Sequence, residues 1–441
     1  MAFERFQDFL SNLVSGQRSL FSSGESSPID QLLEQLMGSV GEVSGIVTAR
    51  QVLDHYHKLS DEEKLAFFQD LEQNFNADPD DVKEAYDAYA ADPSSINLNQ
   101  LSYVTDPLRI KLLRRLNQTP RAAHDLLAMR ADLIRLLREH PELRAVDEDF
   151  HRVFRSWFGR GFLELKTIDW STSAAVLERI IRYEAVHAIK DWDDLRSRID
   201  QPNRRTFAFF HPALVDEPLI FVEVALLQEI PDSIATILDD RALVGEAGKS
   251  RLNGGGPVAG DYKVAAFYSI SNCQPGLKNV SFGNFLIKQV VMELQAEFPS
   301  IKQFVTLSPI PGFGRWLAKE DQSEPAELAD LKTETRQLAR SPEELDKHAE
   351  LIRKCVVNYL ILAKRGMYPL DSVARFHLGN GASIHKIHTD ADRSARGIEQ
   401  SLGAMVNYLY DPKVIERNHE SYAEQGDVHY SDKLKSLLLK L

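Results

Sequence analysis

Cysteine is almost absent from this sequence, and the shortage excludes a disulfide-stapled fold. Among 441 residues there are only Cys273 and Cys355, too few for a disulfide framework and without the spacing of a metal site. We therefore expect a reducing compartment, with the cytoplasm as the default. The ending "LLLKL" lacks the small residue of a peroxisomal signal, so it does not change this expectation.

Long apolar runs and a basic excess are also missing. No run approaches the roughly 20 apolar residues that a membrane-spanning helix needs. The amphipathic N-terminus has no secretory core, and its Glu4 and Asp8 fit poorly with a transit peptide. The formal net charge of −13 excludes a general nucleic-acid binder. A small anion remains a candidate ligand, because local backbone amides can outweigh a distant net charge.

The length and the hydrophobic periodicity predict two domains. Helical spacing dominates the first third, as in "ARQVLDHYHKLSDEEKLAFFQDLEQNF", where Ser60 and Glu63 form a predicted capping box. We assign 1–165 to a helical scaffold or oligomerisation domain and 166–441 to a second domain that carries strands. The acidic stretch 319–350 is predicted to be a solvated helical insertion, and 251–261, "RLNGGGPVAGD", a surface connection.

Short β-branched and aromatic runs mark the strands of the second domain. They are 205–211, 218–227 and 262–271, followed by "IKQFVTLS", which ends at Ser308. Between the last two strands lies the amphipathic helix "NFLIKQVVMELQAEF". This order predicts a βαβ unit with two parallel strands.

The loop that enters this helix is a candidate anion site. Residues Lys278, Asn279, Val280, Ser281, Phe282, Gly283 and Asn284 are predicted to carry the first free N–H groups of the helix, with Lys288 nearby. Free amides and the positive end of the helix dipole suit a diphosphate. The alternative is an ordinary helix start, because many helices begin beside a glycine.

Two further segments place polar side chains at element ends. "TLSPIPGF" stops a strand on Ser308, and two prolines prevent its continuation; this is either turn chemistry or a fixed hydroxyl at a site. In "LDSVARFHLGNGASIHKIH", Asp371 is predicted to cap a helix over 372–378 that ends at "GNG". His377 lies in its last turn, where the dipole favours an imidazolium, unless it is simply a packing residue.

Other reactive residues are weaker candidates. His385, His388 and Asp390 resemble a metal set, but residues three apart on a strand point to opposite faces, so we expect no metal. Cys273 has no identifiable activating base, and we interpret it as a small loop residue.

These segments together resemble the malonyl-CoA decarboxylase family. The resemblance covers most of 156–411, including "EPLIFVEVALL", "AFYSIS", "GNFLIKQVVMELQAEFP", "LSPIPGF", "ARFHLGNGA" and "GAMVNYLYDP". It implies an α+β fold in which an all-helical N-terminal bundle precedes a GNAT-like acyl-CoA-binding domain with a mixed sheet. It also implies conversion of malonyl-CoA to acetyl-CoA and CO2 without a metal or organic cofactor, in a homo-oligomer (dimer or tetramer).

The resemblance assigns roles to particular residues. The family's catalytic serine and histidine fall on Ser308 and His377, and its supporting polar residues fall on Ser269 and Tyr410. The loop from Lys278 to Asn284 would hold the CoA diphosphate, and backbone N–H groups near Ser269 and Ser271 would hold the thioester. Animal members carry a glutamate where this chain has Ser281. If that carboxylate orients the catalytic histidine there, another group must orient His377 here.

Two other functions share these features. A CoA-dependent acyltransferase would use the same CoA loop and parallel strands, but it needs an acceptor pocket and a base for an amine. A non-catalytic acyl-CoA sensor would bind without turnover; the joint presence of Ser308, His377 and Tyr410 argues against it, while Ser281 keeps it open.

Overall fold

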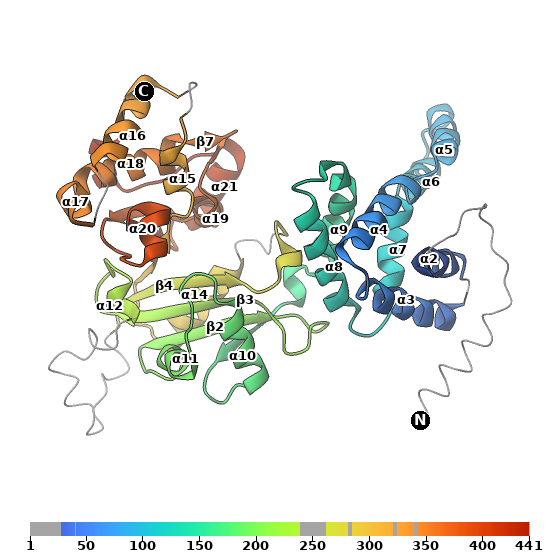
Figure 1. The fold of residues 1–441 in the computed structure, drawn as a ribbon, viewed down its shortest axis with the longest axis horizontal. Helices are drawn as coiled ribbons and strands as arrows, with labels where there is room; N and C mark the ends of the chain where they lie inside the picture. The colour runs from blue at the N-terminus through green and yellow to red at the C-terminus, as the bar shows by residue number, and fades with distance from the viewer. Residues whose placement is uncertain are drawn as a thin grey trace. The chain divides into compact units, whose positions relative to one another are not determined.

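The computed structural model describes residues 28–39, 41–238, 262–280, 285–320, 324–338 and 342–440 (Figure 1). It divides into two compact units. Unit 1 consists of Met1–Leu163, His211–Val215 and Gln274–Ser281, and unit 2 of Glu164–Phe210, Asp216–Cys273 and Phe282–Leu441. The main division therefore falls close to the boundary expected at 165/166, but unit 1 also takes two short segments from the second domain. Each unit is described separately below.

Unit 1 is helical because its apolar residues repeat at helical spacing, and side chains cap the starts of α4, α5 and α6. Ser60 and Glu63 form the predicted capping box, and Asp78 caps the next helix, which has Pro79 in its first turn. Phe68 and Phe150 are among its fully buried side chains. The α-helices are α2 (Pro28–Gly38), α3 (Glu42–Tyr56), α4 (Asp61–Asn74), α5 (Pro79–Ala91), α6 (Ser95–Val104), α7 (Leu108–Leu116), α8 (Ala122–Leu136) and α9 (Arg144–Trp157), with 3-10 turns η1 (Pro141–Leu143), η2 (Arg160–Phe162) and η4 (Pro275–Leu277).

Unit 2 is built on an eight-stranded mixed sheet. The strand order is β1-β2-β3-β4-β5-β10-β6, with β9 also paired to β10, and a separate two-stranded ribbon joins β7 and β8. Only β4 and β5 run parallel; the other pairs in the sheet are antiparallel. The strands are β1 (Glu164–Ile168), β2 (Arg204–Phe210), β3 (Pro218–Leu227), β4 (Val264–Asn272), β5 (Gln303–Thr306), β6 (Ser308–Pro309), β7 (Lys364–Arg365), β8 (Tyr368–Pro369), β9 (Ser383–His388) and β10 (Met405–Tyr410).

The helices of unit 2 cover the sheet and extend beyond it. They are α10 (Ala174–Tyr183), α11 (Trp192–Ile199), α12 (Ala235–Leu238), α14 (Phe285–Glu297), α15 (Phe313–Ala318), α16 (Ala326–Leu338), α17 (Pro342–Lys347), α18 (Ala349–Leu362), α19 (Ser372–Gly379), α20 (Ala395–Ser401) and α21 (Ile415–Gln425), with the 3-10 turn η5 (Asp432–Leu437). Among the described residues no helix is long and apolar enough to cross a membrane. The predicted α+β class is confirmed.

The two faces of the sheet are covered by different helices. Helices α10 and α11 lie against one face of the sheet (Figure 1). There Ala208 and Phe210 of β2 pack in one core cluster with apolar residues of both helices. Side chains alternate along a strand, so Arg205 points to the opposite face. There Arg205 pairs with Glu297 at the end of α14. Strands β2, β3 and β4 are therefore buried on both sides, which explains why β3 reads as an almost continuous apolar run.

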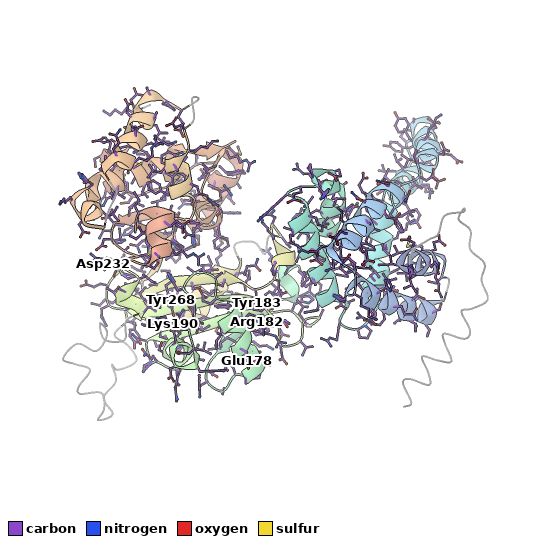
Figure 2. All side chains as sticks on the ribbon, viewed as in Figure 1. Glu178, Arg182, Tyr183, Lys190, Asp232 and Tyr268 are labelled. Carbon is purple, nitrogen blue, oxygen red and sulfur yellow. The ribbon has the colours of Figure 1, made fainter. Side chains whose placement is uncertain are left out.

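The predicted βαβ unit is present, and its two parallel strands separate. Pairing between β4 and β5 runs from Val264 opposite Gln303 to Phe267 opposite Thr306 and then stops. At this point Tyr268, labelled in Figure 2, is an extra residue on β4. Phe267 pairs with Val224 of β3, and Ser269 pairs with the adjacent Glu223. A bulge bends the strand that carries it. The sheet therefore opens between β4 and β5 directly beyond Thr306.

The acidic stretch 319–350 is helical, as predicted, but it is not solvated on every side. It contains α16 and α17, and one face of α16 is buried through Lys332 and Thr335. The Lys332 ammonium pairs with Glu324 and lies 4.5 Å from the ring centroid of Trp316. The expectation was wrong on this face because charge composition does not show which polar residues find partners inside the fold. The stretch 251–261 lies outside the described residues.

Candidate active site

The segment "TLSPIPGF" does not leave the sheet at Ser308. After a break at Leu307, Ser308 and Pro309 form the short strand β6, which pairs with Val406 and Met405 of β10. The expectation that the prolines end the strand at the serine was therefore wrong by one residue. Proline is tolerated at a strand end, where a missing N–H costs no ladder hydrogen bond. Ser308 is thus held by its pairing with β10 and is 6% exposed.

His377 reaches this position on helix α19, whose start and end agree with the prediction. The Asp371 carboxylate accepts the N–H groups of Val373 and Ala374 as an N-cap. After α19 the chain turns at Gly381, where φ is 81° and an added Cβ would lie 2.1 Å from the Ile415 carbonyl oxygen. A side chain there is excluded by both strain and space.

One carboxylate connects the helix of His377 to the turn of Ser308. Asp371 Oδ1 caps α19, while Oδ2 accepts the backbone N–H of Gly312 at 3.2 Å and the Tyr359 hydroxyl at 3.4 Å. Asp371 is buried. Burial raises its pKa, although these hydrogen bonds act in the opposite direction. The cap therefore also fixes the two catalytic candidates relative to each other.

The side chains of Ser308, His377 and Tyr410 meet in one chain of hydrogen bonds. The distance from Ser308 Oγ to His377 Nε2 is 3.0 Å, and that from His377 Nδ1 to the Tyr410 hydroxyl is 2.8 Å. The Ser308 hydroxyl donates to Thr306 Oγ1 at 2.8 Å. The structure thus brings together three of the four residues predicted to be catalytic, from β6, α19 and β10.

The chain is buried and carries no formal charge near neutral pH. Burial lowers the pKa of His377 to about 3 and raises that of Tyr410 well above its ordinary value. The Tyr408 ring stacks on the imidazole with centroids 4.5 Å apart. The expectation that the helix dipole favours an imidazolium was wrong for the ligand-free protein, because desolvation of the charged ring outweighs the dipole.

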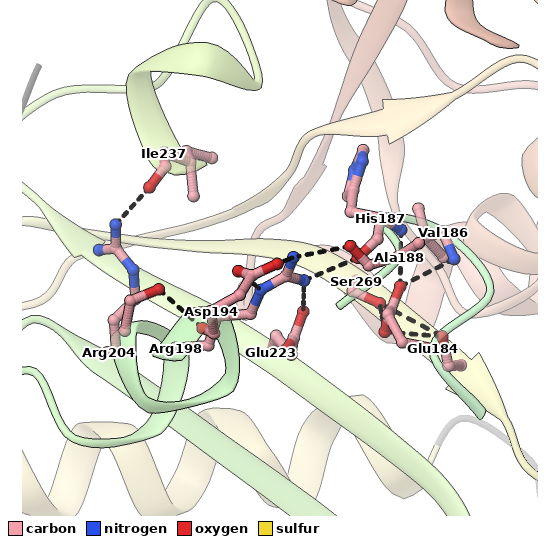
Figure 3. A network of polar contacts seen from close by, with 12 residues as sticks. Glu184, Val186, His187, Ala188, Asp194, Arg198, Arg204, Glu223, Ile237 and Ser269 are labelled. Carbon is pink, nitrogen blue, oxygen red and sulfur yellow. Dashed lines mark hydrogen bonds and ion pairs between the residues drawn. The ribbon is translucent and has the colours of Figure 1, made fainter. Parts of the chain in front are cut away.

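Ser269 and Ser271 lie at a different place, on β4, and bind a buried carboxylate. Both hydroxyls donate to Glu184 Oε2, at 2.7 and 3.1 Å. Glu184 Oε1 accepts the backbone N–H groups of Val186 and His187, so the carboxylate receives four hydrogen bonds (Figure 3). The hydroxyl of Ser269, predicted to be catalytic, is engaged with Glu184 rather than with His377.

Only the first part of the predicted diphosphate loop is described. The N–H groups of Lys278 and Val280 are not free, because they donate to carbonyls of the preceding 3-10 turn. The carbonyls of Lys278 and Asn279 accept from Arg130 and His151 within unit 1. Ser281, Phe282, Gly283 and Asn284 lie outside the described residues. Binding of a diphosphate by this loop stays a prediction.

The weaker candidates are engaged elsewhere. Cys273 is packed in the core cluster under α10 and α11, and burial raises the pKa of its thiol, which agrees with a packing role. His388 Nε2 lies 2.6 Å from the Asn407 side-chain oxygen. His385 is the extra residue of a bulge in β9, and Asp390 pairs with Arg393. In the part of the chain that the structure describes, no three potential ligands gather at a metal-like site.

Sequence reasoning missed Thr306 and Glu184. Thr306 had a usable signal, since residues two apart in an extended chain share a face and Thr306 is two before Ser308. Glu184 follows α10 and had no such signal; only the fold brings it to the serines of β4.

Two models of known families match this chain. The model described as the malonyl-CoA decarboxylase C-terminal domain matches residues 161–441, and that described as the malonyl-CoA decarboxylase N-terminal domain matches residues 75–158. The chain belongs to the malonyl-CoA decarboxylase family. Members of this family from vertebrates and from bacteria are similar to it over most of its length.

The mitochondrial malonyl-CoA decarboxylase of Rattus norvegicus is 34% identical over 370 residues, which is 77% of this chain and 73% of the rat protein. That of Anser anser anser is 32% identical over 77% of this chain and 71% of its own. The crystal structure of malonyl-CoA decarboxylase from Rhodopseudomonas palustris has a TM-score of 0.84 and 43% identity, covering 92% of this chain and 98% of that one. The corresponding structure from Agrobacterium vitis has a TM-score of 0.83 and 41% identity, covering 94% and 100%.

Proposed function

We propose that Ser308 and His377 carry out the protonation step in the decarboxylation of malonyl-CoA, the activity of the family to which this chain belongs. The observation that carries the proposal is the continuous hydrogen-bond chain Tyr410–His377–Ser308 at a place where the sheet opens. Family membership supports the substrate, and the geometry supports the roles of these residues.

Decarboxylation requires the site to accept an electron pair and then return a proton. The bond between C2 and the carboxylate of the malonyl group breaks, CO2 leaves, and the electron pair moves into the thioester carbonyl to give an enolate. A proton then binds C2 and yields acetyl-CoA. The thioester itself accepts the pair, so this chemistry requires neither a metal nor an organic cofactor.

The opening between β4 and β5 is our proposed location for the thioester. Cys273 N–H donates to Leu219 on β3, so along β4 the backbone groups of Ser271 and Ser269 also face β3. Ile270 lies between them and directs its N–H away from β3, to the side where β5 no longer pairs. This amide, rather than those of the two serines, is suited to bind the thioester oxygen or the adjoining amide.

The neutral His377 explains why the proton is delivered only with substrate. Burial lowers the pKa of His377, and in the described part of the chain no charged group offsets this effect. A malonyl carboxylate bound beside the ring would supply that charge and favour the imidazolium. After CO2 leaves, the imidazolium protonates C2 directly or through Ser308, and the proton lost is replaced from solvent.

The CoA diphosphate, the assembly and the compartment belong to the same proposal. The loop from Lys278 to Asn284 would hold the diphosphate. The chain would act as a homo-oligomer, a dimer or tetramer, in the cytoplasm. Two buried cysteines without a disulfide are compatible with a reducing compartment.

The test is to incubate the purified protein with malonyl-CoA and no acyl acceptor, and to measure CO2 and acetyl-CoA. A decarboxylase releases both in equal amounts. An acyltransferase leaves malonyl-CoA intact until an acceptor amine is added, and a sensor binds it without turnover at any time. Either of those results would contradict the proposed activity.

A further inference from the structure

Thr306 is the hydrogen-bond partner of Ser308 at the end of the chain that starts at Tyr410. Thr306, the last residue of β5, is 1% exposed and is fixed by β10. Its carbonyl accepts from the Asn407 side chain at 2.8 Å, and its Oγ1 accepts the backbone N–H of Tyr408 at 3.2 Å. Both its backbone and its hydroxyl are therefore held by the neighbouring strand, so the position of Oγ1 is set by the sheet.

The bond that the Ser308 hydroxyl donates to Thr306 sets the direction of hydrogen bonding along the chain. A backbone N–H can only donate, so Thr306 Oγ1 acts as an acceptor toward Tyr408. It also accepts from the Ser308 hydroxyl at 2.8 Å. The hydroxyl hydrogen of Ser308 therefore points to Thr306, and a lone pair of Ser308 Oγ faces His377 Nε2, 3.0 Å away.

The direction of these bonds selects one tautomer of the neutral imidazole. A nitrogen that donates to Ser308 Oγ must carry a proton, so Nε2 is protonated and Nδ1 is not. Nδ1 then accepts from the Tyr410 hydroxyl at 2.8 Å. The order of donation is Tyr410 to His377, His377 to Ser308, and Ser308 to Thr306.

We infer that Thr306 is a positioning residue that keeps the proton of neutral His377 on Nε2, the nitrogen that faces Ser308. If Thr306 could not accept, the Ser308 hydroxyl would donate to Nε2, and the imidazole would carry its proton on Nδ1, toward Tyr410. The neutral ring would then carry no proton on Nε2, so the imidazolium could form only when a new proton reached this nitrogen. The catalytic consequence rests on the proposed function, whereas the tautomer is a property of the protein alone.

The first experiment reads the tautomer directly. The protein is labelled with 15N-histidine, and the nitrogen shifts of His377 are assigned by their loss in His377→Gln. We expect a protonated Nε2 in the wild type and in Thr306→Ser, and a shift of the proton toward Nδ1 in Thr306→Val. A protonated Nδ1 in the wild type overturns the inference, and this result does not depend on whether Thr306→Val folds.

The second experiment measures turnover of malonyl-CoA. Thr306→Val should lower kcat by about tenfold or more, the effect of losing one buried hydrogen bond, with KM changed by less than about threefold. Thr306→Ser should stay within about threefold of the wild type. The matched control is Thr206→Val on β2, because Thr206 is also fully buried and its hydroxyl has no partner among the described residues.

A double mutant separates positioning from a loss of stability. Thr306 acts through Ser308, so adding Thr306→Val to Ser308→Ala should lower kcat no further. An equal loss in both backgrounds, or an equal loss in the Thr206→Val control, overturns the inference. Failure of the wild type to decarboxylate malonyl-CoA would instead refute the proposed function and leave the nitrogen measurement as the test of Thr306.

Discussion

Two buried clusters of hydroxyl groups in unit 2 differ in what anchors them. Ser269 and Ser271 on β4 donate to the Glu184 carboxylate, which also receives two backbone N–H groups (Figure 3). Ser308 belongs to a chain whose members are neutral in the ligand-free protein, from Tyr410 to Thr306. The first cluster is organised around a charge, and the second is organised around an imidazole.

The difference shows why one serine is suited to proton movement and the others are suited to support. A hydroxyl that donates to a saturated carboxylate is fixed, because giving up that bond leaves a buried charge short of a partner. In the neutral chain each group can both donate and accept, so a proton can shift without leaving a charge unpaired. The sharpest tests of this comparison alter each cluster separately.

The largest expected effect comes from removing Ser308 or His377, the members of the neutral chain that we propose to act on the substrate. His377→Ala and Ser308→Ala should each lower kcat by about 10²–10⁴-fold, the usual cost of losing a general acid. Binding of CoA, measured by calorimetry, should survive because these side chains are not expected to contact the diphosphate. Near-wild-type turnover in either variant would contradict their assignment.

A smaller loss of kcat should follow from removing the Tyr410 hydroxyl, which lies at the other end of the hydrogen-bond chain. Tyr410→Phe keeps the ring and removes the hydroxyl that lies 2.8 Å from His377 Nδ1. Leaving a buried nitrogen without its donor should lower kcat by about tenfold, since such a loss typically costs 1–3 kcal/mol. Steady-state kinetics on malonyl-CoA measure this. An unchanged kcat would mean that Tyr410 only fills space.

Changes in the cluster around Glu184 should alter the stability of the protein rather than its rate of catalysis. Glu184→Gln should lower the free energy of unfolding by about 2 kcal/mol, because charged hydrogen bonds are lost. We expect kcat to stay within about threefold, and KM to rise if the edge of β4 moves. Denaturant unfolding and kinetics measure the two effects. Ser269→Ala, which leaves the charge in place, is the milder control. A loss of kcat as large as that of His377→Ala would abolish the distinction between the clusters.

The effect that is smallest near neutral pH is the contribution of His377 to the pH dependence of stability. The pKa of His377 is about 3 in the fold, against an ordinary value of 6.5. Between these values the unfolded chain binds more protons, so stability falls as the pH falls through this window. In His377→Gln the loss on acidification should be shallower, by at most about 1.4 kcal/mol per pH unit. Unfolding midpoints at several pH values measure it, and parallel profiles for both proteins would argue against a buried neutral imidazole.

Much of the fold and part of the site could be predicted from local patterns. Strand 218–227, the βαβ unit, the Asp371 cap and the turn at Gly381 agree with the structure. Each of these depends on periodicity or on the stereochemistry of a few neighbouring residues. The pairing of Ser308 with His377, 69 residues apart, was implied by family resemblance, and no local pattern contains it.

The errors have a common physical origin. The charge of His377 was judged from the helix dipole, but its pKa is governed by burial, which depends on the stacked Tyr408 and on strands far away in sequence. The amides of Lys278 and Val280 were expected to be free, but the chain forms a 3-10 turn there that uses them. In both cases a local tendency was overruled by neighbours that the sequence order does not show.

By itself, therefore, the sequence determined where many of the helices and strands lie and which residue types were available for proton chemistry. Those properties depend on backbone stereochemistry and on the spacing of apolar residues, which act over a few positions. Only the tertiary structure decided which serine has a neutral histidine beside it and which has a carboxylate. That choice depends on burial and on contacts between distant segments. They are the bulge at Tyr268 that opens the sheet, the Asp371 carboxylate that joins α19 to the turn after Ser308, and the hydrogen bond that Thr306 accepts from the Ser308 hydroxyl.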